Sequence, residues 1–139
     1  MRILLGAQLA QSPATIRFTQ LERGKPQLHP GHGGEIQFNV SHSGDVALVA
    51  LARRHAVGVD VETERALPDA LELARRFFAP TEADALAQLP ATQQPAAFLR
   101  LWTRKEAMLK ATGNGLAGAL HRTDDLPGPW SVTEFAAAP

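Results

Sequence analysis

Two carboxylates, two residues apart, lie in a short β-branched run of the sequence, residues 57–62. The run predicts a strand, and the side chains of Asp60 and Glu62 would then project from one face of it. Glu106 follows about forty residues later and makes a set of three acids. Hard cations such as Mg²⁺ prefer carboxylate oxygens and keep positions open for water and substrate phosphates. The three acids therefore predict a divalent-metal site that handles a phosphate ester.

Glu106 belongs to a predicted helix, residues 96–112, that also carries lysines and a tryptophan. Lys110 lies four residues after Glu106 and Trp102 lies four before it, so the three side chains share one helical face. Gly113 stands where a left-handed residue would end the helix. We therefore expect Lys110 to face the phosphate charge next to the third acid.

Each of these features also has an ordinary structural interpretation. Two acids on a strand most often form a solvated face, and Glu106 with Lys110 would then be a surface pair worth a few tenths of a kcal/mol. Lys105 lies on the apolar side of the helix. It either contacts a phosphate at the edge of the site, or packs its aliphatic stem on the core while the amine reaches solvent.

The elements that must position these residues predict an α+β fold, an antiparallel three- to four-stranded sheet packed against helices. Short turns between consecutive β-branched runs imply antiparallel neighbours. Pro68 would begin one helix, and Thr81 would cap the next, with Asp84 completing a capping box. His29 and His32 flank a glycine-rich loop and are expected to be loop residues. Helices are expected at 1–10, 68–78, after 81 and at 96–112, and strands at 15–18, 36–41, 46–52, 57–61 and 130–135.

The composition suits one globular domain. The 139 residues are 45% hydrophobic and 20% charged, which are ordinary values for a chain with its own core. Without cysteine the chain has neither disulfides nor thiolate metal ligands. Zero net charge and the lack of tyrosine give no indication of nucleic-acid binding. The apolar run at the N-terminus is too short for a signal peptide or membrane span, so we expect a cytoplasmic protein without a membrane partner.

A third segment upstream, residues 38–44, has the sequence F-N-V-S-H-S-G. Together with G-V-D-V-E at 58–62 and W-T-R-K-E-A-M-L-K-A-T-G at 102–113, it resembles the 4'-phosphopantetheinyl transferases, specifically their larger, surfactin-synthetase-activating (Sfp-type) class. The resemblance extends from about Leu4 to Gly115. It also includes G-K-P at 24–26 and R-R-F-F at 75–78, which leads into Thr81 and Glu82.

The resemblance implies an enzyme that moves the 4'-phosphopantetheine arm of coenzyme A to a serine of an acyl, peptidyl or polyketide carrier protein. Adenosine 3',5'-bisphosphate would be released. Asp60, Glu62 and Glu106 would hold Mg²⁺ against the coenzyme A pyrophosphate. Glu106 would also be the candidate general base, and Lys110 would stabilise or protonate the leaving bisphosphate.

The resemblance also implies contacts with coenzyme A. Lys25 and Pro26 resemble the positions that flank the adenine, and Ser41 and His42 resemble those that reach the 3'-phosphate. For His42 alone, a structural hydrogen bond in a turn at the strand end is the simpler interpretation, and the motif around it favours the ligand role. Lys105 remains the candidate phosphate contact beside the third acid.

The ends of the chain depart from the family pattern. The larger class has two similar α/β halves with coenzyme A between them, so within the single domain 1–139 we expect residues 1–56 to be a remnant of the first half. Residues 57–139 would form the second, metal-binding half without its last strand. The smaller holo-acyl-carrier-protein synthases build their site between subunits, so a homo-oligomer is a hypothesis here. The alternative function is a truncated, inactive homologue that binds metal, coenzyme A or a carrier protein without turnover.

Overall fold

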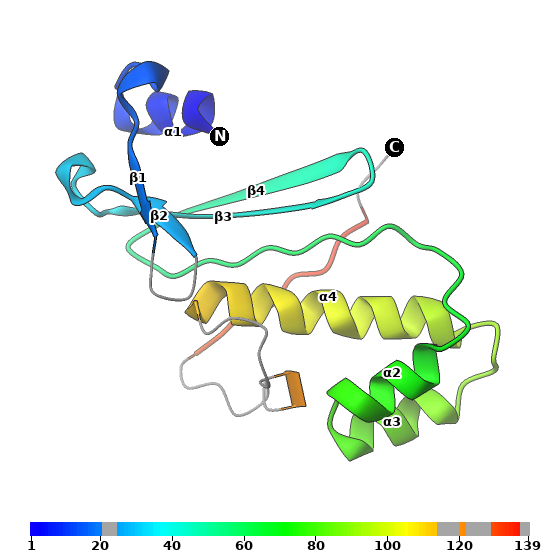
Figure 1. Cartoon of the computed structure of the whole chain (residues 1–139). Helices are drawn as coiled ribbons and strands as arrows, with labels where there is room; N and C mark the ends of the chain where they lie inside the picture. Colours follow the sequence, from blue (N-terminus) through cyan, green and yellow to red (C-terminus); the bar gives the residue numbers. More distant parts are fainter. Residues whose placement is uncertain (21–24, 114–119, 122–128, 137–139) are drawn as a thin grey trace.

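Helices and strands alternate in blocks along the chain (Figure 1), as the computed structural model shows for residues 1–20, 25–113, 120–121 and 129–136. This part of the chain confirms the α+β class. Its elements are the helices α1 (Arg2–Leu9), α2 (Ala70–Phe77), α3 (Pro80–Ala87) and α4 (Gln94–Thr112), the strands β1 (Phe18–Gln20), β2 (Pro26–Leu28), β3 (Ile36–Ser43) and β4 (Val46–Arg53), and the 3₁₀ turns Pro13–Thr15 and Pro30–His32.

The β3–β4 hairpin is the central element of the fold. Its strands pair antiparallel from Ile36 opposite Arg53 to Ser43 opposite Val46, and Gly44 adopts a left-handed φ of 56° in the turn. Side chains alternate between the two faces of a strand, so Ile36 and Phe38 lie on one face while Asn39, Ser41 and Ser43 lie on the other. The hairpin therefore presents an apolar face and a polar face.

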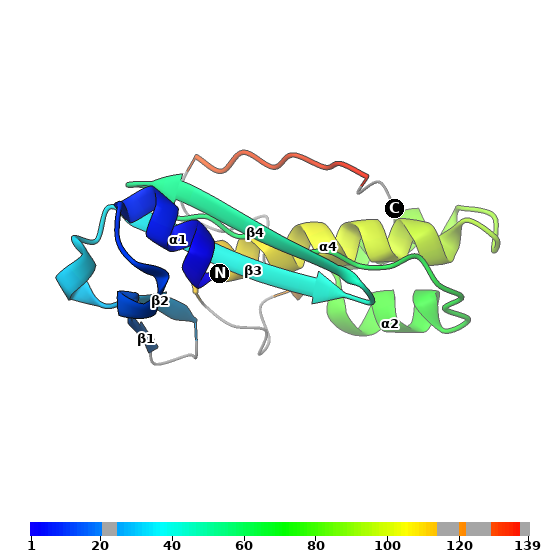
Figure 2. The same ribbon diagram turned by 90° about the horizontal axis from the view of Figure 1, so that it is seen from above.

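The apolar face packs on the N-terminal elements. Figures 1 and 2 show α1, β1 and β2 gathered at the open end of the hairpin. β1 and β2 pair antiparallel in a small sheet of their own. The buried cluster here consists of Leu5, Ile16, Leu28, Ile36 and Phe38.

The helices form a second core, beyond the polar face of the hairpin. α4 runs beneath the hairpin, and α2 and α3 pack against it at the far end (Figure 1). The rings of Phe78 and Phe98 stack with centroids 4.9 Å apart, and Trp102 lies 5.8 Å from Phe98. The buried members are Ala70, Ala74, Phe78, Ala83, Leu86, Phe98 and Leu99.

The strand predicted at 57–61 is wrong, and with it the single three- to four-stranded sheet. Residues 57–66 are extended but join no ladder, and the described strands form two separate two-stranded sheets. The physical reason is that the N–H groups of Val59 and Val61 donate to side chains of β3 and not to strand carbonyls. Residues 130–135, also predicted as a strand, are likewise extended without a ladder partner in the described chain.

Two local predictions need correction. The strand expected at 15–18 begins at Phe18, because Pro13 starts a 3₁₀ turn that occupies residues 13–15. Helix α3 begins at Pro80, one residue before the predicted cap, and the Glu82 carboxylate accepts the Ala79 N–H at 2.9 Å. The acid that caps the N-terminus of this helix is therefore Glu82 and not Asp84.

The helix predicted at 96–112 is confirmed as α4, which begins two residues earlier. Gly113 ends it with φ 73°, and its N–H donates to the Leu109 carbonyl, as the left-handed cap requires. Of the helices in the described ranges, none is both long enough and apolar enough to cross a membrane.

Candidate active site

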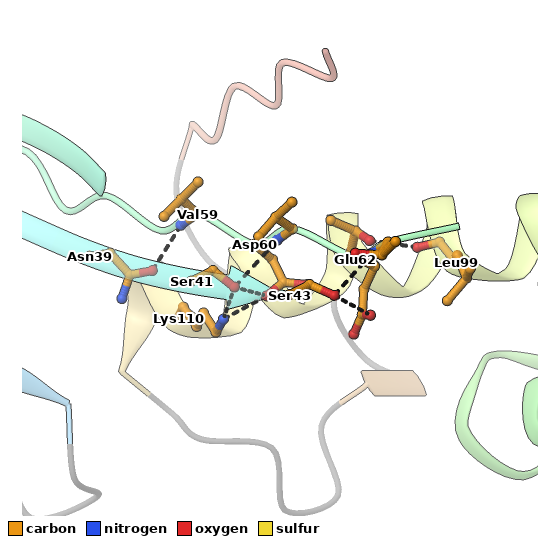
Figure 3. A network of polar contacts seen from close by, with 11 residues as sticks. Asn39, Ser41, Ser43, Val59, Asp60, Glu62, Leu99 and Lys110 are labelled. Carbon is orange, nitrogen blue, oxygen red and sulfur yellow. Dashed lines mark hydrogen bonds and ion pairs between the residues drawn. The ribbon is translucent and has the colours of Figure 1, made fainter. Parts of the chain in front are cut away.

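The extended segment 57–63 is fixed to the polar face of β3 by three side chains. Asn39 Oδ1 accepts the Val59 N–H at 2.9 Å. Ser41 Oγ accepts the Val61 N–H at 3.3 Å, and Ser43 Oγ accepts the Thr63 N–H at 3.0 Å. Each partner lies 20 positions further along the chain, so the register is constant. Figure 3 shows these side chains reaching from β3 to the segment.

The other side of this segment touches the backbone of α4. A Cβ atom at Gly58 would overlap the carbonyl oxygen of Ala107 and would lie 2.5 Å from the Ala111 nitrogen. Glycine therefore permits a close approach between the segment and the helix. This approach brings the predicted acids next to the helix that carries Glu106 and Lys110.

Asp60 and Lys110 form the centre of the site. Lys110 Nζ lies 2.6 Å from Asp60 Oδ1 and 3.0 Å from Ser41 Oγ, and the Ser41 hydroxyl donates to Asp60 Oδ1 at 2.7 Å (Figure 3). The Asp60 side chain is 7% exposed. Its second oxygen, Oδ2, is buried and has no hydrogen-bond partner among the described residues. Oδ1 of Asp60 is thus paired with the Lys110 ammonium, whereas Oδ2 has no partner among the described residues.

Glu106 is buried close to this pair. The residue is 5% exposed, and its Oε1 atom also lacks a hydrogen-bond partner in the described part of the chain. Burial raises the pKa of Glu106 to about 7; the charges of Asp60 and Glu62 raise it too, while Lys110 opposes them. A carboxyl with this pKa exchanges its proton near neutral pH, as a general base must.

Glu62 points its carboxylate toward a different partner. Arg65 Nη1 lies 2.7 Å from Glu62 Oε2, and the Ser43 hydroxyl donates to the same oxygen at 3.4 Å. Within the described ranges, no three acidic or histidine side chains are arranged to hold a metal ion. The bare oxygens of Asp60 and Glu106 nevertheless fit a hard cation, because an unpaired buried carboxylate oxygen is the donor that such a cation lacks.

Lys25 lies at the junction of the segment and α4. Its amine donates to the Ala111 carbonyl at 2.9 Å and to the Val57 carbonyl at 3.3 Å, and burial lowers its pKa. With Pro26 it lines a hollow of about 600 Å³ that also touches Phe38 and Thr112. The predicted contact of Lys25 and Pro26 with an adenine stays a prediction, and the hollow gives it space.

The structure separates Ser41 and His42, which were predicted to reach one phosphate. Ser41 is buried on the polar face of β3, where it bonds to Asp60, Val61 and Lys110. His42 is exposed and, as the next residue of the strand, projects from the opposite face. The two side chains therefore do not converge here.

Lys105 lies in the helical core. It is 2% exposed, and its ammonium lies 2.7 Å from Glu82 Oε1, donates to the Leu120 carbonyl at 3.0 Å and sits 5.6 Å from the centre of the Phe78 ring. The interpretation that its amine reaches solvent is therefore wrong. Its role as a phosphate contact stays a prediction, although the Lys105 ammonium already pairs with the Glu82 carboxylate.

The sequence interpretation missed Asn39, Ser43 and Gly58. All three position the acids without being acids. A pattern in the sequence could have found the first two: N-x-S-x-S alternates along a predicted strand with the same period of two as D-x-E. No comparable pattern identifies Gly58, because its role depends on the approach of a helix some fifty residues later.

The buried Glu106 predicts a pH-dependent stability of the metal-free protein. Its pKa of about 7 lies above the ordinary value of 4.5, so the folded state binds the proton more tightly than the unfolded state does. The protonated carboxyl therefore contributes to the free energy of unfolding. This contribution is fully present below pH 4.5 and is lost as the pH rises through 7, and the loss is on the order of 3 kcal/mol.

Urea unfolding with a chelator at pH 5 and pH 8 measures this loss, with Glu106→Gln as the reference for all other titrating groups. We expect the variant to gain stability relative to the wild type as the pH rises. A difference between the two proteins that is equal at both pH values would refute the assignment.

Comparisons with known proteins identify a family for the chain. A family model described as the 4'-phosphopantetheinyl transferase superfamily matches residues 56–136. The 4'-phosphopantetheinyl transferase HetI of Nostoc sp. is 42% identical over 118 residues, 84% of this chain and 50% of HetI. AcpT of Salmonella typhimurium is 36% identical over 134 residues, 96% of this chain and 67% of AcpT. Sfp of Bacillus subtilis is 34% identical over 120 residues, so the chain spans about half the length of HetI and Sfp.

Proposed function

The chain belongs to the 4'-phosphopantetheinyl transferase superfamily, and on this basis we propose that it is an enzyme that transfers the 4'-phosphopantetheine moiety of coenzyme A to a carrier protein. The acceptor would be a serine hydroxyl of an apo acyl, peptidyl or polyketide carrier. The observation that carries the proposal is the contact group of Asp60, Lys110 and Glu106, in which each acid has a buried oxygen without a hydrogen-bond partner among the described residues.

Asp60, Glu62 and Glu106 are the proposed ligands of Mg²⁺. When bound there, Mg²⁺ neutralises charge on the coenzyme A pyrophosphate, the main requirement of phosphoryl transfer. Glu62 pairs with Arg65 Nη1 through Oε2 at 2.7 Å, so it would contribute through its other oxygen or after this pair opens. Both other acids already carry an oxygen without a hydrogen-bond partner in the described chain.

Glu106 and Lys110 are the proposed catalytic residues. Glu106, whose pKa is about 7 in the metal-free protein, would take the proton of the carrier serine, whose oxygen forms the new bond to the phosphorus of the phosphopantetheine arm. The bond from that phosphorus to the pyrophosphate bridge breaks, and adenosine 3',5'-bisphosphate leaves. The Lys110 side chain is 30% exposed, and its ammonium would meet the charge on the departing group.

The remaining parts of the proposal concern coenzyme A and the organisation of the chain. Lys25 and Pro26 would flank the adenine, supported by the hollow that they line. Ser41, His42 and Lys105 would meet phosphates. Residues 1–56 and 57–139 would correspond to the two halves of the family fold, as supported by one hydrophobic cluster on each side of that boundary. We also propose that the chain self-associates to complete the coenzyme A site. A cytoplasmic location is proposed as well.

Incubation with coenzyme A, Mg²⁺ and a panel of apo acyl, peptidyl and polyketide carriers tests the function. The expected result is a carrier that gains the mass of one phosphopantetheine, with release of the bisphosphate. A chelator and a carrier with its acceptor serine changed to alanine are the controls. If every carrier stays unmodified while the chain binds coenzyme A or a divalent ion, the alternative of a homologue that binds without turnover replaces this proposal.

A further inference from the structure

Ser41 and Ser43 make the same pair of hydrogen bonds, two residues apart. The Ser41 hydroxyl donates to Asp60 Oδ1 at 2.7 Å and accepts the N–H of the next residue, Val61, at 3.3 Å. The Ser43 hydroxyl donates to Glu62 Oε2 at 3.4 Å and accepts the N–H of Thr63 at 3.0 Å. Each hydroxyl thus fixes one acid and the peptide that follows it.

We propose that Ser41 and Ser43 are positioning residues that set the spacing and orientation of the two acids on segment 57–63. This inference rests on the proposed function for its consequence, which is the metal site. Its argument is the match between two patterns of period two, S-x-S on β3 and D-x-E on the segment, held in a constant register of 20 residues.

The chemistry of a hydroxyl explains why serine suits these positions. A hydroxyl has one hydrogen to donate and lone pairs that accept, so it can hold a carboxylate and a peptide N–H at once. Asn39 makes the third contact of this register, in which its Oδ1 accepts the Val59 N–H, and no carboxylate of the described residues lies next to that contact in the way that Asp60 lies next to Ser41. Serine is therefore found at the two β3 positions whose side chains also contact a carboxylate.

The same geometry shows what the Ser41 hydroxyl contacts in this structure. Its single hydrogen points to Asp60 Oδ1, and Lys110 Nζ lies 3.0 Å from its oxygen. Ser41 is thereby linked to the acid and to the lysine of the proposed site. Its predicted contact with the 3'-phosphate of coenzyme A stays a prediction.

The two serines differ in how tightly they hold their acid. Ser41 is 6% exposed and its bond to Asp60 is short, while Ser43 is half-buried and its bond to Glu62 is long. Residues that orient metal ligands typically contribute 10- to 100-fold in affinity. We expect Ser41→Ala to weaken Mn²⁺ binding by up to about 100-fold and Ser43→Ala by about tenfold or less.

Mn²⁺ titration followed by electron paramagnetic resonance measures this effect without any transferase assay. Ser43→Thr keeps the hydroxyl and is expected to bind Mn²⁺ within about threefold of the wild type, and Ser131→Ala, at an exposed serine, is the control. In the Asp60→Asn background, Ser41→Ala should cause no further loss, because its effect passes through that carboxylate.

Wild-type Mn²⁺ affinity in Ser41→Ala and Ser43→Ala would overturn the proposal, as would an undiminished loss from Ser41→Ala beside Asp60→Asn. If Ser41→Ala does not fold, the Ser43→Ala and Ser43→Thr pair decides, because loss in both would rule out the hydroxyl. A chain that transfers nothing yet shows the expected Mn²⁺ pattern would refute the proposed function and leave the positioning role intact.

Discussion

Replacing Glu106 with glutamine is expected to lower the rate of phosphopantetheine transfer by at least about 10²-fold, the contribution of a single general base, while the metal-free protein at pH 8 becomes no less stable. The amide has nearly the size of the carboxylate but neither its charge nor its basicity. Glu106 is 5% exposed beside Asp60, so removing its charge relieves repulsion in the folded state. Activity and stability should therefore change in opposite directions.

The measurement combines the carrier-modification rate with urea unfolding of the same preparation. Lys105→Met does not serve as a control, because its ammonium is buried against Glu82. Glu134→Gln does, since this acid pairs with Arg100 on the surface and should leave both properties near wild type. Retained transfer in Glu106→Gln would exclude Glu106 as the general base, and an unfolded variant would show that its carboxylate is needed by the fold.

Gly58→Ala is expected to lower the free energy of unfolding by about 3 kcal/mol, the upper part of the range for overpacking. The added methyl group would meet the Ala107 carbonyl and the Ala111 nitrogen, which are backbone atoms of α4 and cannot rotate away. Either the helix or the segment must then move. Because Asp60 is two residues further along, its contact with Lys110 should be lost together with stability.

Urea unfolding and Mn²⁺ titration of Gly58→Ala test both parts of this expectation. Gly31→Ala is the matched control, since a Cβ there would lie 3.2 Å from the His29 ring and meet no backbone atom. Only the hydrogen bond from the Gly31 N–H to His29 Nδ1 would be disturbed, and we expect a loss below about 1 kcal/mol. Equal stability of the two variants would contradict the close approach at Gly58. A destabilised Gly58→Ala that binds Mn²⁺ normally would contradict its link to the position of Asp60.

Periodicity in the sequence predicted the elements whose stability is local. The helix around Glu106 was recognisable from its helix formers and from Gly113, and the β3–β4 hairpin from its β-branched runs, because turns and caps are determined by neighbours in the sequence. Spacing placed Lys110 beside Glu106 on one helical face, whereas Asp60 was assigned to the same site from residue types and the motif resemblance. In the structure, Lys110 Nζ contacts Asp60 Oδ1 at 2.6 Å.

The predictions that were wrong concern the contacts between elements that are distant in the sequence. Residues 57–61 have strand propensity, but serine and asparagine side chains on β3 satisfy their N–H groups, so propensity alone could not decide between a ladder and a side-chain register. Lys105 was recognised as unusual, yet its partner Glu82 comes from a different helix. Partners contributed by another element cannot be obtained from local pattern.

Segment 57–63 has a further consequence for the order in which the chain folds. The hairpin β3–β4 and the helix α4 are built from contacts close in sequence, which form early because they close short loops. The segment can dock only when both exist, since its partners lie 20 residues before it and about 50 residues after it. We therefore expect Asp60 to reach Glu106 and Lys110 only in the last steps of folding, and a chain that lacks α4 would keep Asp60 and Glu62 without Glu106 and Lys110.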